Sequence, residues 1–383
     1  MLLTGSGLLI RSLIHLQMLP PGFDAHGVLT AQTSLDQADY HDPARFTKLM
    51  QESVAAMQRI PGVMQAAVGL SLPYQRGLNN DVTVKDGKQA GQQAMTSEIY
   101  ITPAYFDALG MRLRDGRAFA DSDTAITEPV AIVNESFARQ ILHDPNPVGR
   151  MLESDKKPVR IVGIVDDVQT KPGLDDTGPI STERTLYIPA TQTPGDLLAL
   201  VHVWFQPSWI IRSSHLDAQT PAAMQRALSS VDPNLPFASF HTMDDLLATA
   251  LAQQRIEVAL LTSLAVLAVL LAALGIFALV SSVITDRQRE FGIRIALGSP
   301  LSDSMLVAVR SGVVPAVIGL ASGLTLALVV LRAMRSALFG ISSYDPVTLV
   351  ATMLLLLALA ALASLLPALR ITRIQPVEVL RAE

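Results

Sequence analysis

The sequence predicts an α+β water-facing domain followed by an α-helical transmembrane domain. Three long stretches in the C-terminal third carry no charged residue. Residues 22–250, in contrast, alternate strand-like and helix-like stretches that Pro and Gly interrupt. Of the 383 residues, 50% are hydrophobic and 16% are charged, which fits a globular module joined to a membrane module.

The N-terminal residues 1–19 begin with an apolar run from Leu2 to Ile10 that Arg11 and His15 interrupt. This run is too short to cross a bilayer unaided. No positive region precedes it and no small-residue cleavage site follows it, so a signal peptide is not indicated. We interpret residues 1–19 as the remnant of a first transmembrane helix and its outward extension.

Two strand–helix–strand units are predicted at the two ends of the large domain. The first has a strand over 28–35, a helix over 43–59 and a strand over 66–72. The second has a strand over 209–214, a helix over 221–231 and a strand over 237–241. Between them we expect an inserted subdomain, with strands at 130–133, 160–165 and 185–188 and a helix at 135–142.

Three transmembrane helices are predicted near 258–285, 311–331 and 346–369. Each stretch is uncharged and reaches the roughly 20 residues that span a bilayer. The alternative, buried helices of a soluble protein, would require protein cover on all sides of each helix.

Arginines beside the spans predict the orientation, because cytoplasmic flanks carry the excess of positive charge. One side has Arg287, Arg289, Arg294, Arg370, Arg373 and Arg381. The other side has Arg255, Arg332 and Arg335. We therefore expect a multi-pass protein of the plasma (inner) membrane with its large domain outside the cytoplasm.

The polar connector after the first span has a helical pattern of charges. Arg287, Glu290 and Arg294 share one face, and Glu290 precedes Arg294 by four residues, the favourable order for an ion pair. Gly298 is placed to end the helix. From the pattern alone, a solvated and self-paired connecting helix is the alternative to a binding element.

The connector resembles a known family element. Residues 287–298, RQREFGIRIALG, resemble the RxxEIGIRxAxGA element of the FtsX and MacB permease superfamily. The tail, with Leu366-Pro367-Ala368-Leu369-Arg370 and Pro376-Val377-Glu378-Val379-Leu380-Arg381, is similar to the ending of that family. Further matches along the chain include Pro21-Gly22-Phe23-Asp24, Ile60-Pro61-Gly62-Val63, Gly116-Arg117-x-Phe119, Val130-Ala131-Ile132-Val133-Asn134-Glu135 and Asp345-Pro346. Together they most resemble the second half of the large duplicated MacB-like permeases.

This resemblance implies a MacB-like periplasmic core domain over residues 20–250 and an FtsX-like permease domain over 255–383. It also implies four spans per half, the first of which would end within residues 1–19. A cytoplasmic ABC ATPase subunit would contact the coupling segment and drive the outer domain by mechanotransmission. The implied coupling residues are Arg287, Glu290, Phe291, Gly292, Arg294 and Gly298. Phe291 stands where Ile is usual, and Ser299-Pro300 replaces the family's Ala and polar residue.

The resemblance implies further partners: a second permease half or a homodimer partner, the lipid bilayer and a periplasmic adaptor. Nucleic acid is not an expected partner, because the net charge is -5 and no basic run occurs.

No catalytic, cofactor-binding or metal site is predicted. The sequence has no Gly-x-x-x-x-Gly-Lys-Ser/Thr, so ATP hydrolysis is expected of a partner chain. It also has no cysteine and no Gly-x-Ser-x-Gly. The histidines lack metal-ligand spacing; they are His15, His26, His41, His143, His202, His215 and His241.

Two aspartate pairs are candidate sites. Asp121 with Asp123, and Asp166 with Asp167, could act as acid and base or as ligands of a hard metal ion. Each pair follows a turn or a strand, where aspartate commonly binds local backbone groups instead. We expect this local role for both pairs.

The predicted function is therefore a permease subunit of an ABC-type transporter that exports or extracts a substrate, whose identity the sequence does not indicate. One alternative is an FtsX-like regulator that transports nothing and activates a periplasmic partner such as a wall hydrolase. The other is a truncated remnant.

Overall fold

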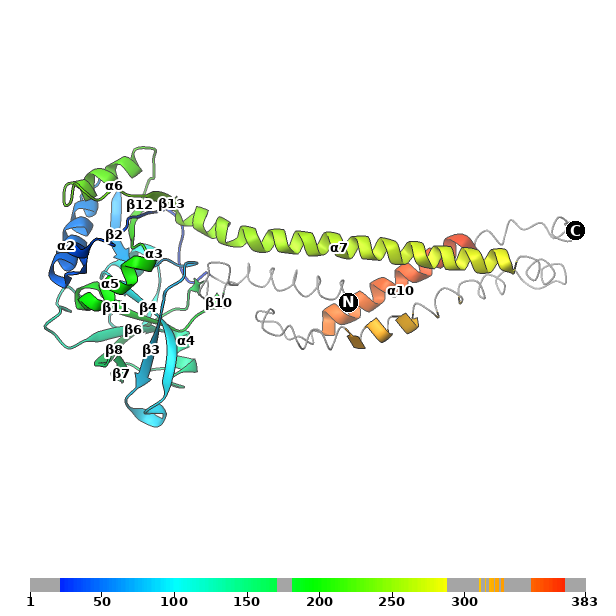
Figure 1. Cartoon of the computed structure of the whole chain (residues 1–383), viewed down its shortest axis with the longest axis horizontal. Helices are drawn as coiled ribbons and strands as arrows, with labels where there is room; N and C mark the ends of the chain where they lie inside the picture. Colours follow the sequence, from blue (N-terminus) through cyan, green and yellow to red (C-terminus); the bar gives the residue numbers. More distant parts are fainter. Residues whose placement is uncertain are drawn as a thin grey trace, which may run out of the picture. The chain divides into compact units, whose positions relative to one another are not determined.

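The structure is a computed structural model that describes residues 21–170 and 181–287, scattered helical positions between 310 and 326, and residues 346–368. The chain divides into two compact units (Figure 1). One comprises Pro20–Leu251, and the other comprises Met1–Leu19 with Ala252–Glu383.

Two strand–helix–strand motifs interlock in the first unit. Their elements are β1 (Val28–Gln32), α2 (Pro43–Gln58), β2 (Val63–Gly69), β12 (Ser208–Ser213), α6 (Thr220–Ser229) and β13 (Ser239–Thr242). β12 lies between β1 and β2, antiparallel to both, and β1 lies between β12 and β13. Each helix therefore joins two parallel strands that are separated by a strand of the other motif, which is the ferredoxin-like arrangement. Both predicted units are present.

Local sequence explains why α2 forms where it does. Asp42 caps its start by accepting a hydrogen bond from the Ala44 N–H at 3.3 Å, and Pro43 suits the first helical position. Phe46, Leu49, Met50 and Met57 recur at helical spacing and are buried. This apolar face packs α2 against the sheet.

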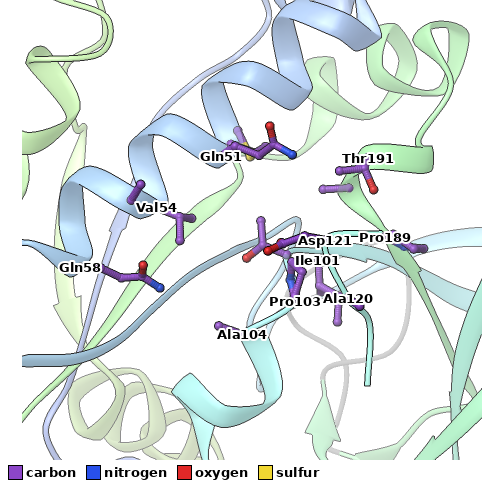
Figure 2. A pocket seen from close by; sticks show the side chains of 14 residues that line it. Gln51, Val54, Gln58, Ile101, Pro103, Ala104, Ala120, Asp121, Pro189 and Thr191 are labelled. Atoms are coloured by element: carbon purple, nitrogen blue, oxygen red, sulfur yellow. The ribbon is translucent and has the colours of Figure 1, made fainter. Parts of the chain in front are cut away.

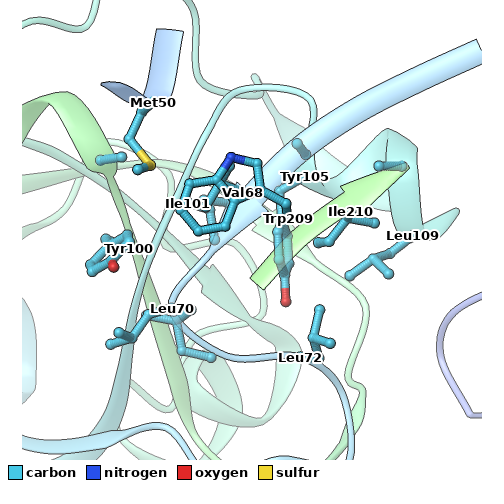
Figure 3. Close-up of a cluster of buried hydrophobic side chains, with 14 of the residues drawn as sticks. Met50, Val68, Leu70, Leu72, Tyr100, Ile101, Tyr105, Leu109, Trp209 and Ile210 are labelled. Atoms are coloured by element: carbon cyan, nitrogen blue, oxygen red, sulfur yellow. The ribbon is translucent and has the colours of Figure 1, made fainter. Parts of the chain in front are cut away.

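Trp209 of β12 lies at the centre of the core shared by α2 and the sheet (Figure 3). Its side chain is fully buried, and its indole Nε1–H donates to the Ser53 Oγ at 2.8 Å. A buried indole donor needs a partner of this kind. The bond thereby fixes α2 over the sheet.

The inserted subdomain is a closed ring of strands. Its members are β3 (Leu78–Val84), β4 (Gln93–Ile101), β6 (Val130–Asn134), β7 (Met151–Ser154), β8 (Lys157–Val165) and β11 (Thr185–Pro189). Pairing runs β4–β3–β7–β8–β6–β11 and returns from β11 to β4. The ring has a hydrophobic core of its own, with Val82, Leu152, Ile161 and Leu186 buried in it.

β4 joins the ring to the ferredoxin-like sheet, because its last residue, Ile101, pairs with Gly69 of β2. The shorter elements between β2 and β12 in the chain are α3 (Tyr105–Leu109), β5 (Leu113–Gly116), α4 (Glu135–Gln140), β9 (Gln169–Thr170), β10 (Ser181–Thr182), the 3-10 helix η3 (Ala190–Gln192) and α5 (Gly195–Trp204). The strands predicted at 130–133, 160–165 and 185–188 are present as β6, β8 and β11. β3, β4 and β7 were not predicted.

The helix α7 (Met243–Asp286) is the longest element. Its first residues belong to the unit Pro20–Leu251, called the outer domain from here on, where Met243 and Ala250 are buried in the core. The part Val258–Asp286 is, among the described residues, the one helix long and apolar enough to cross a membrane. Its leucines Leu260, Leu264, Leu267, Leu271 and Leu274 are exposed, as expected for a surface that faces lipid.

The third predicted span coincides with the helix α10 (Pro346–Ala368). Within the predicted span at 311–331, the structure describes only scattered helical positions. The count of three spans therefore stays a prediction.

Candidate functional site

The predicted ATPase-coupling segment lies almost entirely outside the described residues. Arg287 directly follows α7, with an exposed side chain and a backbone N–H that donates to the Val283 carbonyl at 3.1 Å. The remaining predicted residues fall outside the described part of the chain: Glu290, Phe291, Gly292, Arg294 and Gly298. Their role stays a prediction.

Asp123 is a structural residue that organises the loop after β5. Arg117 donates to both carboxylate oxygens of Asp123, at 2.7 and 2.8 Å, and the Ala120 N–H donates to one of them at 2.9 Å. The hydrogen bonds from Arg117 hold the pKa of this carboxyl below its usual value. The predicted local role is confirmed for Asp123, with Arg117 as a further partner. Asp121, in contrast, is exposed.

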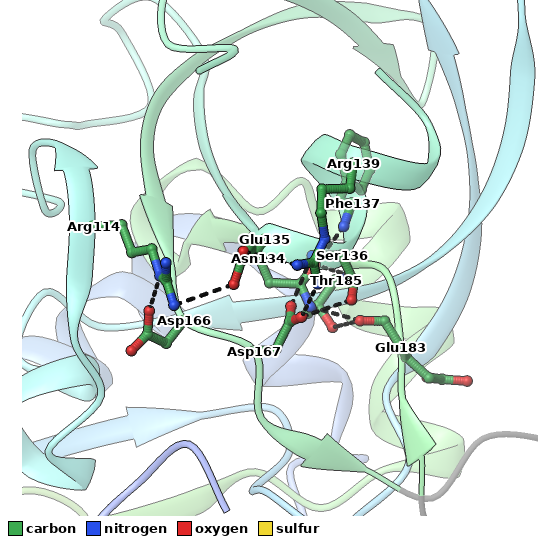
Figure 4. A network of polar contacts seen from close by, with 10 residues as sticks. All are labelled: Arg114, Asn134, Glu135, Ser136, Phe137, Arg139, Asp166, Asp167, Glu183 and Thr185. Atoms are coloured by element: carbon green, nitrogen blue, oxygen red, sulfur yellow. Dashed lines mark hydrogen bonds and ion pairs between the residues drawn. The ribbon is translucent and has the colours of Figure 1, made fainter. Parts of the chain in front are cut away.

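The second aspartate pair lies in a polar network between β6, β8 and β11 (Figure 4). Asp167 accepts from the Ser136 N–H at 2.8 Å and the Ser136 hydroxyl at 2.7 Å, both at the start of α4. Burial raises the pKa of Asp167, although these hydrogen bonds oppose the shift. Asp166 pairs with Arg114. Both carboxylates are thus engaged by protein groups, which argues for a structural role.

Asn134 is the central residue of this network. Its Oδ1 accepts from the N–H groups of Phe137, at 3.0 Å, and Thr185, at 2.8 Å, while its Nδ2 donates to the Glu183 carbonyl at 2.6 Å. The side chain is fully buried. It caps α4 and ties that helix to β11.

The histidines of the outer domain show no metal-binding arrangement. Among the described residues, no three His, Asp or Glu side chains are grouped to hold a metal ion. His202 of α5 is buried and lies 2.8 Å from the hydroxyl of Tyr100. Burial lowers its pKa to about 4, with His41 nearby adding to the shift, so His202 is neutral at physiological pH.

Glu98 of β4 is a buried carboxyl group that sequence reasoning did not single out. It is 2% exposed and accepts from the Asn80 amide at 3.0 Å and the Ser154 hydroxyl at 2.8 Å. Burial raises its pKa to about 7 in spite of these bonds, and the charge of Asp155 adds to the shift. No ion pair to Glu98 occurs within the described residues.

A pocket of about 520 Å³ lies between α2 and the carboxyl ends of β4 and β11 (Figure 2). Gln51, Val54 and Gln58 line it from α2. The opposite wall comes from Ile101 to Ala104, Ala120 with Asp121, and Pro189 to Thr191. Sequence reasoning noted Asp121 but not the pocket, because only the folded chain brings these four segments together.

The family of the chain follows from two profile matches. The MacB-like periplasmic core domain matches residues 15–231, which is more than half of the chain. The FtsX-like permease C-terminal domain matches residues 262–376. The chain belongs to the MacB/FtsX family of ABC transporter permeases. The resemblance that the connector and tail motifs indicated is thereby confirmed.

Known relatives of the permease are larger proteins. The macrolide export ATP-binding/permease protein MacB of Escherichia coli K12 is 24% identical over 346 residues, covering 89% of this chain and 50% of the relative. The protein of the same name from Shigella flexneri matches to the same extent. The chain thus spans about half the length of the curated relatives it matches.

Among solved structures, the chain matches the periplasmic region of MacB from Actinobacillus actinomycetemcomitans. It is 16% identical with a TM-score of 0.39, covering 60% of this chain and 94% of that one.

Proposed function

We propose that this chain is a permease subunit that couples a separate cytoplasmic ABC ATPase to its periplasmic domain by mechanotransmission. Export or extraction of a substrate through the cell envelope would be the result. The observation that carries the proposal is the presence of both domains, a MacB-like periplasmic core and an FtsX-like permease C-terminus, in one chain.

The source of energy is inferred from the sequence. The relatives are named ATP-binding/permease proteins, whereas this sequence contains no Gly-x-x-x-x-Gly-Lys-Ser/Thr that would cradle nucleotide phosphates. A partner chain would therefore bind and hydrolyse ATP. A second permease half or a homodimer partner would complete the membrane part, which we place in the inner membrane as a multi-pass domain.

The coupling role is assigned to the connector that begins at Arg287. It directly follows the apolar helix α7 and carries charges of both signs. A connector with charges of both signs at the cytoplasmic end of a span would suit a complementary surface on an ATPase.

Charge reversal tests this assignment. The double variant Glu290→Lys/Arg294→Glu should abolish stimulation of the ATPase partner or prevent complex formation, measured by ATP hydrolysis and co-purification in reconstituted membranes. A matched control is Glu128→Lys/Arg160→Glu, which reverses an exposed ion pair of 2.8 Å in the outer domain. If stimulation and complex formation survive the connector variant unchanged, the coupling proposal is wrong.

A further inference from the structure

The pocket under α2 has the size and lining of a small-molecule site. Its volume of about 520 Å³ lies in the range of ligand pockets, which are mostly apolar with a few polar groups. The apolar lining residues are Met50, Val54, Ala55, Ile101, Pro103, Ala104, Ala120, Pro189 and Ala190. Of these, Met50, Ile101 and Ala190 are buried.

The pocket carries one charge, and that charge is negative. Asp121 is the only ionisable side chain among the described residues that line it. The nearby Arg117 is held by both oxygens of Asp123. Within the described part of the chain, the Asp121 carboxylate has no hydrogen bond or ion pair of its own. The Asp121 carboxylate could therefore form an ion pair with a positively charged ligand.

Some of the other polar side chains that line the pocket have hydrogen-bond partners in the protein, and others have none among the described residues. The Thr102 hydroxyl lies 2.8 Å from the Val68 N–H, from which it accepts, and the Thr191 hydroxyl donates to the Asp123 carbonyl. The amides of Gln51 and Gln58, on the exposed side of α2, bind no other group among the described residues. Figure 2 shows both glutamines on the same side of α2 as Asp121 and Ala104.

Hydrogen bonds within the protein hold the loop that forms one wall of the pocket. The Arg117–Asp123 pair shapes the loop that carries Asp121, and the Thr191 bond ties this loop to η3. Gln192 adds bonds to the carbonyls of Thr124 and Glu128, each at 3.1 Å. A site that is already ordered loses less entropy on binding.

We propose that this pocket binds a small amphipathic organic cation. The apolar body would lie against Val54, Ile101 and Pro103, and the positive group would lie beside Asp121 at the open rim. Binding of this kind depends only on the outer domain and not on coupling to an ATPase. It can therefore fail or succeed independently of the function proposed above.

The test uses two probes with the same apolar body and head groups of opposite charge, 4-phenylbutyltrimethylammonium and 4-phenylbutanesulfonate. The full chain is placed in nanodiscs of zwitterionic lipid, and binding of each radiolabelled probe is measured by equilibrium dialysis with empty nanodiscs subtracted. We expect saturable binding of the cation and weaker binding of the anion. Asp121→Asn should weaken the cation's affinity about two- to fivefold, the range of a solvent-exposed ion pair.

Two further variants complete the test. Asp107→Asn removes an exposed carboxylate that does not line the pocket and should leave affinity unchanged. Ala55→Trp places an indole in the pocket from the half-buried face of α2 and should abolish saturable binding. The proposal is overturned if the cation shows no saturable binding, if the anion binds as tightly, or if either Asp121→Asn or Ala55→Trp leaves binding unchanged.

Discussion

At the scale of single residues, the acidic side chains of the outer domain differ in what surrounds them. Asp123 and Asp167 are satisfied by hydrogen bonds, whereas Glu98 is buried and has no ion pair among the residues that the structure describes. A buried carboxyl group that lacks a positive partner favours its neutral form. Glu98 therefore makes the stability of the strand ring depend on pH.

Glu98→Gln should remove this pH dependence. The pKa of Glu98 is raised from 4.5 to about 7 in the folded chain, so the group stabilises the fold fully below pH 4.5. That contribution is lost as the pH rises to about 7, a difference on the order of 3 kcal/mol between pH 4.5 and pH 8. The variant should be more stable than the parent at pH 8.

Urea unfolding at several pH values measures this effect through the fluorescence of the buried Trp209, in a Trp204→Phe background. Glu52→Gln, on the exposed face of α2, is the control. Its unfolding free energy should change with pH as steeply as that of the parent. If the unfolding free energy of Glu98→Gln changes with pH as steeply as that of the parent, another group causes the pH dependence.

Asn134→Ala should destabilise the outer domain by about 2 to 4 kcal/mol. The change removes the cap of α4, leaves the buried Thr185 N–H without its acceptor, and leaves the Glu183 carbonyl with only the 3.4 Å bond from the Thr185 hydroxyl. The same unfolding measurement detects it. Asn146→Ala, at an exposed position, should have little effect, and an equal loss in both variants would contradict the role given to Asn134.

At the scale of elements, periodicity in the sequence predicted the ferredoxin-like part well. The helix predicted at 43–59 is α2, Pro43–Gln58, because its apolar residues have one clear face. β3 was not predicted because Asn79, Asn80 and Asp81 interrupt the run of apolar residues that indicates a strand. Such residues are tolerated there because the strand is paired on both sides and contributes only Val82 and Val84 to the core of the ring.

The candidate pocket could not be predicted for a related reason. Its lining comes from four segments, around residues 50–58, 101–104, 120–121 and 189–191, and none has a motif of its own. Only the pairing of β4 with β11, which places Pro189 beside Ile101, brings two of these segments together. The parallel pairing of β4 with β11 cannot be predicted from a local sequence pattern, because the two strands lie far apart in the chain.

Leu271→Arg in α7 tests whether this helix lies in lipid. A central arginine in place of leucine should cost about 3 to 4 kcal/mol of insertion free energy, whereas Leu271→Phe should cost little. The sequence has no cysteine, so a single Ser122→Cys in the outer domain can be labelled from outside intact cells with an impermeant maleimide. Labelling should fall only in the arginine variant, and equal labelling in both would argue against a lipid-facing α7.

At the scale of the whole molecule, the chain combines a water-facing domain with a permease domain of one family. Both were predicted from the sequence, since uncharged stretches and the connector motif are local features. The proposed coupling between the two domains does not follow from a local feature. It has to be measured on the permease together with the proposed ATPase partner.

Hydrogen–deuterium exchange of that complex, with and without nucleotide, tests the central claim most directly. If the connector transmits nucleotide-driven closure, exchange should change in peptides from residues 21–251, and Glu290→Lys/Arg294→Glu should remove the change. Identical exchange throughout the outer domain, while the bound ATPase hydrolyses ATP, would contradict mechanical coupling.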